Sequence, residues 1–127
     1  MPTRAHEFDA GLDLYSAYND VYIYPRESEL FDTGVHIQLP KNTVGFLKSK
    51  SGLNVKSGIT SEGVIDVGYT GSIMVKLYNH SDKPYRVRKG DKISQLVILP
   101  CLLPELEVVD SLEETERGTG GFGSTGR

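Results

Sequence analysis

A chain of 127 residues has room for a single domain, 1–127, whose small core makes oligomerisation a reasonable expectation. The formal net charge of −3 argues against a nucleic-acid binder, which is usually basic. Every apolar run is far shorter than the roughly 18 residues of a membrane span. The only cysteine, Cys101, cannot form an internal disulfide. Residues 1–4 lack the apolar stretch of a secretory signal, so we expect a cytoplasmic location, or a nuclear one in a eukaryotic host.

Apolar and polar residues alternate along short stretches of the chain, which predicts strands with one buried face. The clearest are 35–39 and 73–77, and the continuous apolar run 96–99 predicts a strand covered on both faces. Shorter strands are predicted at 21–24, 43–47, 85–87 and 106–109. Many short strands separated by glycine, proline and asparagine turns predict an all-β sandwich, jelly roll or barrel.

The last eleven residues, 117–127, contain five glycines and one aromatic residue, Phe122. By composition alone they form a flexible tail, because they have too little apolar surface to order themselves. A ring framed by glycines also offers a stacking surface beside free backbone N–H groups, which suits a nucleotide. The glycine spacing satisfies G-x-G-x-x-G, but a dinucleotide fold also needs a strand before it and a helix after it, so we reject that interpretation.

Five segments spread over nearly the whole chain resemble, in order and spacing, the motifs of the trimeric dUTPase family. They are 10–17, 48–53, 63–71, 90–96 and 117–126. The resemblance implies a distorted jelly-roll or β-clip subunit, a homotrimer, and a mobile C-terminal arm, 117–127, that closes over a neighbouring subunit's site. It also implies an enzyme that hydrolyses dUTP to dUMP and pyrophosphate with Mg²⁺, keeps uracil out of DNA and supplies dUMP for dTMP synthesis.

Asp66 is the expected general base. It lies between 63–65 and a predicted tight turn at Val67-Gly68, so a rigid hairpin would hold it in place. The resemblance assigns it the attacking water and the 3′-hydroxyl; the alternative is an aspartate that stabilises its own turn. Tyr69 would lie against the deoxyribose and leave no room for a 2′-hydroxyl, or it would be an ordinary aromatic residue of the core.

Uracil would be recognised by backbone groups of the same hairpin. The resemblance assigns this task to Gly63, Val64, Ile65, Asp66 and, on the return strand, Met74. Uracil presents an N3–H donor between two acceptors and cytosine reverses part of that pattern. The wrong base would leave buried groups unpaired, which discriminates by about 10⁴-fold. The methyl group of thymine would overfill a close-packed site, at a cost of about 1–3 kcal/mol.

The phosphates would be held by Lys50, Ser51 and Gly52, together with Gln95, which interrupts an apolar strand. The family usually has arginine at the position of Lys50; lysine keeps the charge but loses the bidentate fork. Asp13 resembles the acid that holds the hydration shell of a Mg²⁺ ion bridging the phosphates. The alternative for Asp13 is a structural partner for a backbone amide or an arginine.

The resemblance implies that the arm binds substrate, because it places the aromatic ring of the arm on the uracil and its polar residues at the γ-phosphate. Ordering it over bound nucleotide would exclude water and strengthen the charge contacts beneath it. The arm residues expected to contact substrate are Arg117, Gly121, Phe122, Gly123, Ser124 and Thr125.

Two departures from the family pattern concern the start of the chain and the uracil site. Relatives usually have a strand before the segment matching 2–4; without it, another segment covers the sheet edge or the subunit is less stable. The stretch 57–63 is short, so Thr60 or Ser61 is a candidate replacement for an asparagine that many relatives use near uracil.

Two rival functions belong to different classes. A deoxycytidine triphosphate deaminase shares the fold but needs its own acid/base pair near the pyrimidine C4, and the hairpin contains no such carboxylate. A nucleotide-responsive regulatory module would have lost turnover, whereas Asp66, Tyr69 and the complete arm are present. A regulatory protein partner in addition to catalysis is compatible with the sequence, but no residue pattern identifies one.

Overall fold

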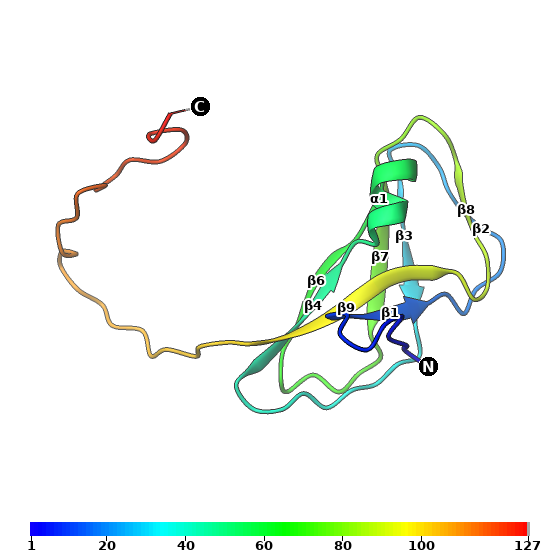
Figure 1. Cartoon of the computed structure of the whole chain (residues 1–127), viewed down its shortest axis with the longest axis horizontal. Coiled ribbons are helices and arrows are strands. Elements are labelled where there is room, and N and C mark those ends of the chain that lie inside the picture. The colour runs from blue at the N-terminus through cyan, green and yellow to red at the C-terminus, as the bar shows by residue number, and fades with distance from the viewer. Residues whose placement is uncertain (127) are drawn as a thin grey trace.

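The computed structural model describes residues 1–126 (Figure 1). Within them, nine strands and one short helix follow one another along the chain. They are β1 (Gly11–Tyr15), β2 (Val21–Ile23), β3 (Ser28–Asp32), β4 (Thr43–Lys48), α1 (Ser51–Ser57), β5 (Ile59–Thr60), β6 (Glu62–Ile65), β7 (Met74–Asn79), β8 (Tyr85–Val87) and β9 (Lys92–Pro100). The helix has only seven residues, which is too short to cross a membrane.

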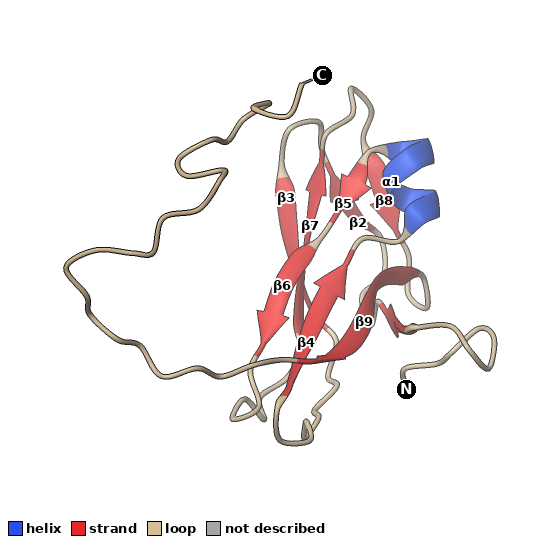
Figure 2. Ribbon diagram, turned by 60° about the vertical axis from the view of Figure 1, so that its left-hand side comes forward, coloured by secondary structure: helices blue, strands red, loops and turns tan. Residues whose placement is uncertain are grey.

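The strands form three antiparallel sheets, with the orders β1-β9-β4-β6, β3-β7-β5 and β2-β8. Strands from the two halves of the chain pair in a nested way, β1 with β9, β2 with β8 and β3 with β7. This pairing wraps the chain into layers that face each other, and Figure 2 shows β4, β6 and β9 in front of β3 and β7. The all-β jelly-roll class predicted from the sequence is therefore confirmed.

The core lies between the sheets and takes apolar side chains from all three of them. Strand β7 is typical: Val75 and Leu77 are buried while their neighbours along the strand face outward, as the alternation in 73–77 predicts. Each such side chain contributes about 1.5–3 kcal/mol by leaving water. The fully buried apolar residues include Leu14, Ile23, Phe31, Ile59, Ile73, Leu77, Val87, Ile93 and Leu96.

The strand predicted at 35–39 is wrong, although its side chains do alternate between half-buried or buried and exposed. Gly34, with a φ of 67°, turns the chain away from the direction of β3. After this turn, the backbone hydrogen bond toward β7 is the one from the Ile73 N–H, just before β7, to the Val35 carbonyl. The stretch therefore packs on the core without joining a sheet. An alternating pattern reports which side chains are buried, and not whether the backbone has a partner strand.

The apolar run 96–99 does lie in β9, but its expected cover on both faces is wrong for the single chain, because Ile98 and Leu99 are 41% and 38% exposed. The strand predicted at 106–109 is also wrong. Residues 101–126 contain no strand or helix and run away from the sheets, as Figure 1 shows, so the extended C-terminal arm includes residues 101–116 as well as the predicted 117–126. Leu102 and Leu106 are more than 90% exposed, because one chain offers them no surface on which to pack.

The edge of β1 is partly covered by the N-terminal segment. Thr3 and Asp13 exchange two backbone hydrogen bonds, with N–O distances of 2.7 and 3.3 Å. A single bridge of this kind satisfies part of the edge that a preceding strand covers in relatives. Of the two expectations for this edge, cover by another segment is the one that the fold supports.

The sequence prediction did not include helix α1. It ends at Ser57, and Gly58 after it adopts a left-handed φ of 66° and donates its N–H to the Asn54 carbonyl. A glycine after a lysine in the last turn is a usual helix C-terminus, so Lys56 and Gly58 together carried the missing signal. The helix matters for function because its first residues are Ser51 and Gly52.

Candidate functional site

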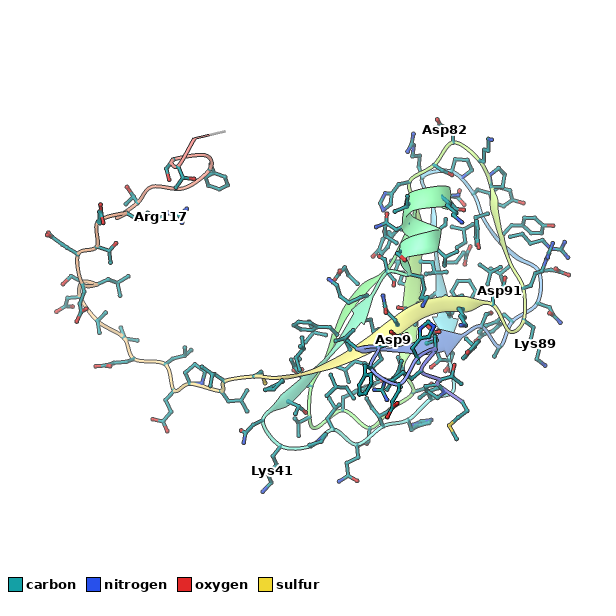
Figure 3. The ribbon with its side chains drawn as sticks, in the orientation of Figure 1. Asp9, Lys41, Asp82, Lys89, Asp91 and Arg117 are labelled. Carbon is teal, nitrogen blue, oxygen red and sulfur yellow. The ribbon has the colours of Figure 1, made fainter. Side chains whose placement is uncertain are left out.

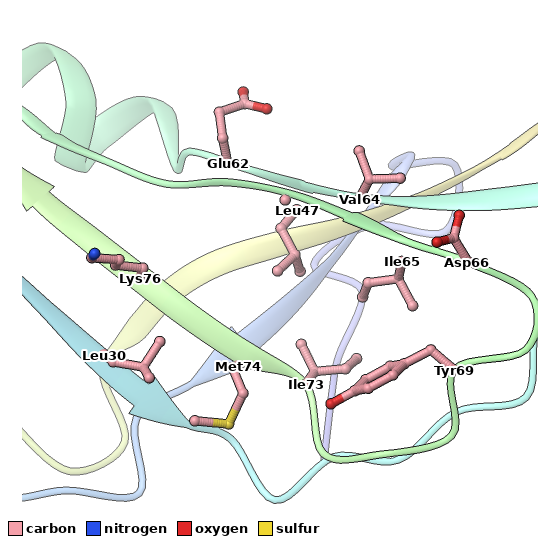
Figure 4. Close-up of a pocket in the computed structure, with 11 residues that line it drawn as sticks. Leu30, Leu47, Glu62, Val64, Ile65, Asp66, Tyr69, Ile73, Met74 and Lys76 are labelled. Atoms are coloured by element: carbon pink, nitrogen blue, oxygen red, sulfur yellow. The ribbon is translucent and has the colours of Figure 1, made fainter.

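A cavity of about 290 Å³ opens between β6 and β7 (Figure 4). The two strands do not pair with each other, because β6 bonds to β4 while β7 bonds to β3 and β5. The hydrogen-bonded hairpin expected here is therefore wrong: its two arms belong to different sheets, and their separation makes the cavity. The residues that line it are Leu30, Leu47, Glu62, Gly63, Val64, Ile65, Asp66, Tyr69, Ile73, Met74 and Lys76.

One end of the cavity carries Asp66 and Tyr69. The Tyr69 N–H donates to the Asp66 carbonyl at 3.0 Å, which closes the tight turn predicted at Val67-Gly68. The Asp66 side chain is exposed at the edge of the cavity, and the Tyr69 ring lies along it beside Ile73 (Figure 4). The Tyr69 hydroxyl donates to the Ser72 carbonyl at 2.7 Å, so the ring is held at both ends. The alternative of a core aromatic does not apply, because Tyr69 is 45% exposed.

A second polar group lies around Asp13, which is only 3% exposed. Lys50, from the segment after β4, donates to Asp13 Oδ1, and Lys92 Nζ at the start of β9 lies 2.9 Å from Oδ2. Burial by itself would raise the pKa of Asp13, but the two lysines outweigh it and hold the pKa below its usual value. In the alternative considered for Asp13, its partner was an arginine or a backbone amide; the side chains that pair with it are two lysines.

The two oxygens of the Asp13 carboxylate differ in their hydrogen bonding. The Oδ1 atom accepts from Lys50, whereas Oδ2 is buried and receives no aligned hydrogen bond within residues 1–126, since Lys92 approaches it only as an ion pair. A carboxylate oxygen has more than one lone pair, so the ion pair with Lys92 leaves Oδ2 with capacity to accept a further hydrogen bond. The Oδ2 atom can therefore accept a hydrogen bond from a bound water or a ligand.

Ser51 and Gly52 begin helix α1, and Lys50 before them has extended backbone angles and supplies no side-chain cap, as far as residues 1–126 go. The first N–H groups of a helix have no partner inside the helix, so those of Ser51 and Gly52 can bind an outside acceptor. A Cβ atom on Gly52 would meet open space. The backbone at this point is accessible to an anion.

Gln95 lies beside the same segment and is half-buried. Its Nε2 donates to the Ser49 carbonyl at 3.0 Å, and its Oε1 lies over the backbone of Gly11, where a Cβ atom would be 2.0 Å away. Position 11 must therefore lack a side chain for Gln95 to take this place. Ser94, next to it in β9, bonds inward to the Lys48 carbonyl at 3.0 Å.

Neither candidate for the missing uracil-site asparagine reaches the cavity. The Thr60 hydroxyl is bonded to His80 Nε2 at 2.8 Å. Ser61 is buried and its hydroxyl is bonded to that of Ser94 at 2.9 Å, inside the core. Both hydroxyls are thus used within the fold, and the prediction that one of them replaces the asparagine is not supported by their positions.

The chain brings together some predicted site residues and keeps others apart. Residues 63–66, Tyr69 and Met74 line one cavity, whereas Asp13, Lys50 and Gln95 lie beyond the opposite end of β6, past the Lys48–Glu62 ion pair. Four residues of strand separate Asp66 from Glu62, which is about 13 Å. The arm joins neither group, and Figure 3 shows Arg117 far from the sheets.

Sequence reasoning missed half of the cavity wall. Glu62 and Lys76 lie on strands that carry predicted residues, and Ile73 directly precedes one of them, so their nearness in the sequence was a usable signal. Leu30 and Leu47 come from β3 and β4, and only the nested strand pairing places them here. No local pattern in the sequence could have included these two.

Comparison with known proteins identifies the family. A family model for dUTPase matches residues 1–126. The deoxyuridine 5′-triphosphate nucleotidohydrolase of Clostridium tetani is 45% identical over 130 residues, with 100% of this chain and 89% of the relative covered. The Staphylococcus bacteriophage 80alpha dUTPase with dUPNHPP has a TM-score of 0.92 and 35% identity, and the match covers 100% of this chain and 92% of the phage chain. The dUTPase from phage phi11 of S. aureus, with a structural Mg(II) ion, has a TM-score of 0.82 and 31% identity over 90% of this chain and 92% of its own. The chain therefore belongs to the dUTPase family.

Proposed function

We propose that this chain hydrolyses dUTP to dUMP and pyrophosphate, keeping uracil out of DNA and supplying dUMP for dTMP synthesis. The observation that carries the proposal is the cavity between β6 and β7, which presents backbone groups of residues 63–65 along one wall and Asp66 with Tyr69 at one end. Its volume of about 290 Å³ suits a nucleoside better than a triphosphate, so the phosphates extend beyond it.

Asp66 acts as the general base. It takes a proton from a water molecule whose oxygen attacks the α-phosphorus, while the bond from that phosphorus to the bridging oxygen breaks and pyrophosphate leaves. A carboxylate that is exposed at the cavity edge and held by a tight turn can receive this proton without rearrangement of the backbone. The same carboxylate accepts a hydrogen bond from the 3′-hydroxyl.

The nucleoside is recognised by the walls of the cavity. The strand β6 bonds to β4 on one side only, so the other edge of residues 63–65 is available to pair with uracil, together with Met74 of β7. Tyr69 forms the wall against the deoxyribose. A cytosine would leave buried groups unpaired, and a thymine methyl group would overfill the site.

The triphosphate is held by the polar residues of β1, β9 and the segment from Lys50 into α1. Ser51 and Gly52 offer backbone N–H groups, Gln95 offers a side-chain amide, and Lys50 turns from Asp13 to a phosphate oxygen. Mg²⁺ keeps most of its waters when it binds phosphates and needs few carboxylates, so the Oδ2 atom of buried Asp13, which has no aligned hydrogen bond within residues 1–126, fits a hydrogen bond to its hydration shell. When bound, the ion neutralises charge on the phosphates.

The complete site draws on more than one copy of the chain, as a homotrimer. Asp66 and the phosphate-binding residues lie at opposite ends of β6 within one chain, about 13 Å or more apart, which favours their meeting across an interface. The exposed Leu102 and Leu106 favour packing of the arm on a neighbour. There Phe122 stacks on uracil, Gly121 and Gly123 let the backbone approach closely, and Arg117, Ser124 and Thr125 contact the γ-phosphate.

The test measures pyrophosphate release from dUTP, dCTP, dTTP and UTP with Mg²⁺, for the wild type and Asp66→Asn. We expect release from dUTP alone, lowered by about 10²–10⁴-fold in the variant because a general base is lost. Mixing Asp66→Asn chains with Gln95→Ala chains should restore activity, since hybrid trimers contain sites with both native residues. Binding of dUTP by the wild type without turnover would contradict the enzymatic proposal and leave a nucleotide-binding module.

A further inference from the structure

The Tyr69 ring lines the cavity from a loop, residues 66–73, and not from a strand. Two contacts define where it lies. Its hydroxyl donates to the Ser72 carbonyl at 2.7 Å. Its ring covers Gly71 so closely that a Cβ atom there would be 2.6 Å from the Tyr69 hydroxyl oxygen and 2.7 Å from the ring carbon that bears it. The ring therefore occupies the space that a side chain at position 71 would need.

Ser72 is itself held by β3. Its hydroxyl donates to Asp32 Oδ1, and the same oxygen accepts the Gly34 N–H at 2.9 Å. These two bonds and the nearby His36 hold the pKa of the Asp32 carboxyl below its usual range. Because Asp32 is the last residue of β3, which is bonded to β7 along its whole length, this carboxylate is a fixed point of the sheet. The contacts run from Asp32 through Ser72 to the Tyr69 hydroxyl.

Further bonds join the same segment after β3 to the loop. The Ile73 carbonyl accepts from Thr33 twice, from its N–H at 3.1 Å and its hydroxyl at 2.7 Å, and the Ile73 N–H donates to the Val35 carbonyl at 2.8 Å. His36 Nδ1 donates to the Thr70 carbonyl at 2.9 Å. Residues 70–73 are therefore tied to residues 32–36, and the loop cannot move without breaking several of these bonds.

We propose that Asp32, Ser72 and Gly71 are positioning residues that set the location of the Tyr69 ring, and through it the discrimination between 2′-deoxyribonucleotides and ribonucleotides. The inference rests on the proposed function, in which Tyr69 is the wall against the sugar. None of the three residues needs to touch the substrate. They act because a 2′-hydroxyl is excluded only if the ring stays within a fraction of an ångström of its place.

The test compares kcat/KM for dUTP with kcat/KM for UTP in the wild type, Gly71→Ala, Ser72→Ala, Ser72→Thr and Asp32→Asn. A methyl group at position 71 displaces the far end of a flexible side chain, so the ring moves and the fold remains. We expect the dUTP to UTP ratio to fall about 10-fold or more, since a misplacement of about 1 Å costs up to about 10²-fold. Ser72→Ala and Asp32→Asn lower it less, and Ser72→Thr, which keeps the hydroxyl, retains the wild-type ratio.

Two variants serve as matched controls. Gly68→Ala changes a glycine in the same loop whose Cβ would meet nothing within 4 Å, and Asp82→Asn removes an exposed aspartate that pairs with Arg26. Both should keep the wild-type ratio. In a Tyr69→Phe background, which lacks the bond to Ser72, adding Asp32→Asn should change the ratio little further, a coupling that a general loss of stability would not produce.

Tyr69→Ala separates the inference from the proposal beneath it. If Tyr69→Ala lowers the ratio while Gly71→Ala, Ser72→Ala and Asp32→Asn all retain it, the positioning roles are overturned and the proposed function stands. If Tyr69→Ala itself retains the ratio, Tyr69 is not the wall against the sugar, and the inference falls together with that role, while dUTP hydrolysis, measured in the same assay, stands. Thermal denaturation of each variant identifies any that fails to fold. If Gly71→Ala fails to fold, Ser72→Ala, at a loop position, still tests the proposal.

Discussion

The cavity between β6 and β7 and the arm of residues 101–126 differ in how they obtain their order. Around the cavity, Ile65, Ile73 and Val75 are buried, and the loop between the strands is bonded to the segment after β3. In the arm, apolar side chains such as Leu106 and Phe122 face solvent, and the chain forms only local turns. Contacts within one chain shape the cavity, whereas the same chain supplies the described part of the arm with few such contacts.

The largest expected effect is on stability, and it tests whether the two regions really are independent. Leu77→Ala empties a fully buried site in β7 and should lower the free energy of unfolding by about 2–5 kcal/mol. Leu106→Ala, a leucine of the arm that is 96% exposed, should change it by less than about 0.5 kcal/mol. Urea denaturation at equal protein concentration measures both. A cost above about 1 kcal/mol for Leu106→Ala would show that the arm is already packed on another copy without nucleotide.

The next effect is expected in the arm and not in the cavity, and it concerns activity and not stability. Phe122→Ala removes the ring proposed to stack on uracil, and stacking of a base on an aromatic side chain contributes about 1–3 kcal/mol. We expect kcat/KM for dUTP to fall roughly 10-fold with the unfolding transition unchanged. Thr119→Ala, at an exposed arm position, is the matched control. Wild-type kcat/KM in Phe122→Ala would remove the arm from the site.

A smaller effect is expected at Gln95, which is proposed to contact the phosphates. Gly11→Ala places a Cβ atom where the Gln95 amide now lies, so the amide must move. The expected loss in kcat/KM for dUTP is about 1 kcal/mol, or roughly 5-fold. In a Gln95→Ala background the same change should have little further effect, because its target is gone. Full additivity of the two changes would mean that Gly11 acts on something other than Gln95.

The smallest effect is the pH dependence of the bond between β3 and the Tyr69 loop. Donation from the Ser72 hydroxyl and the Gly34 N–H holds the pKa of Asp32 below its usual value. Its contribution to stability is therefore present above the unfolded-state pKa, about 3.9, and is lost as the pH falls through the lower folded-state value. Asp32→Asn should be less stable than the wild type near about pH 7, with the difference shrinking below about pH 4 in thermal denaturation. A difference that stays constant with pH would assign the effect to neutral hydrogen bonds.

Local sequence patterns were sufficient where a property depends on neighbouring residues. The alternation in 73–77 identified β7 because burial repeats every second residue along a strand, and the turn at Val67-Gly68 follows from the residues within it. The same reasoning was misled at 35–39 and 106–109. In the first stretch side chains are buried without a strand partner, and in the second apolar residues find no surface within one chain.

Motif order and residue type are properties of the chain, and they were enough to predict the family, the all-β class and Asp66, Tyr69 and Gln95 as candidate site residues. The three-dimensional fold was needed to show that β6 and β7 belong to different sheets, that Lys50 and Lys92 both contact Asp13, and that Asp32 is bonded to the loop of Tyr69. Each of these contacts joins residues from separate parts of the chain, and it forms because the nested strand pairing buries a common core. No local pattern contains that information.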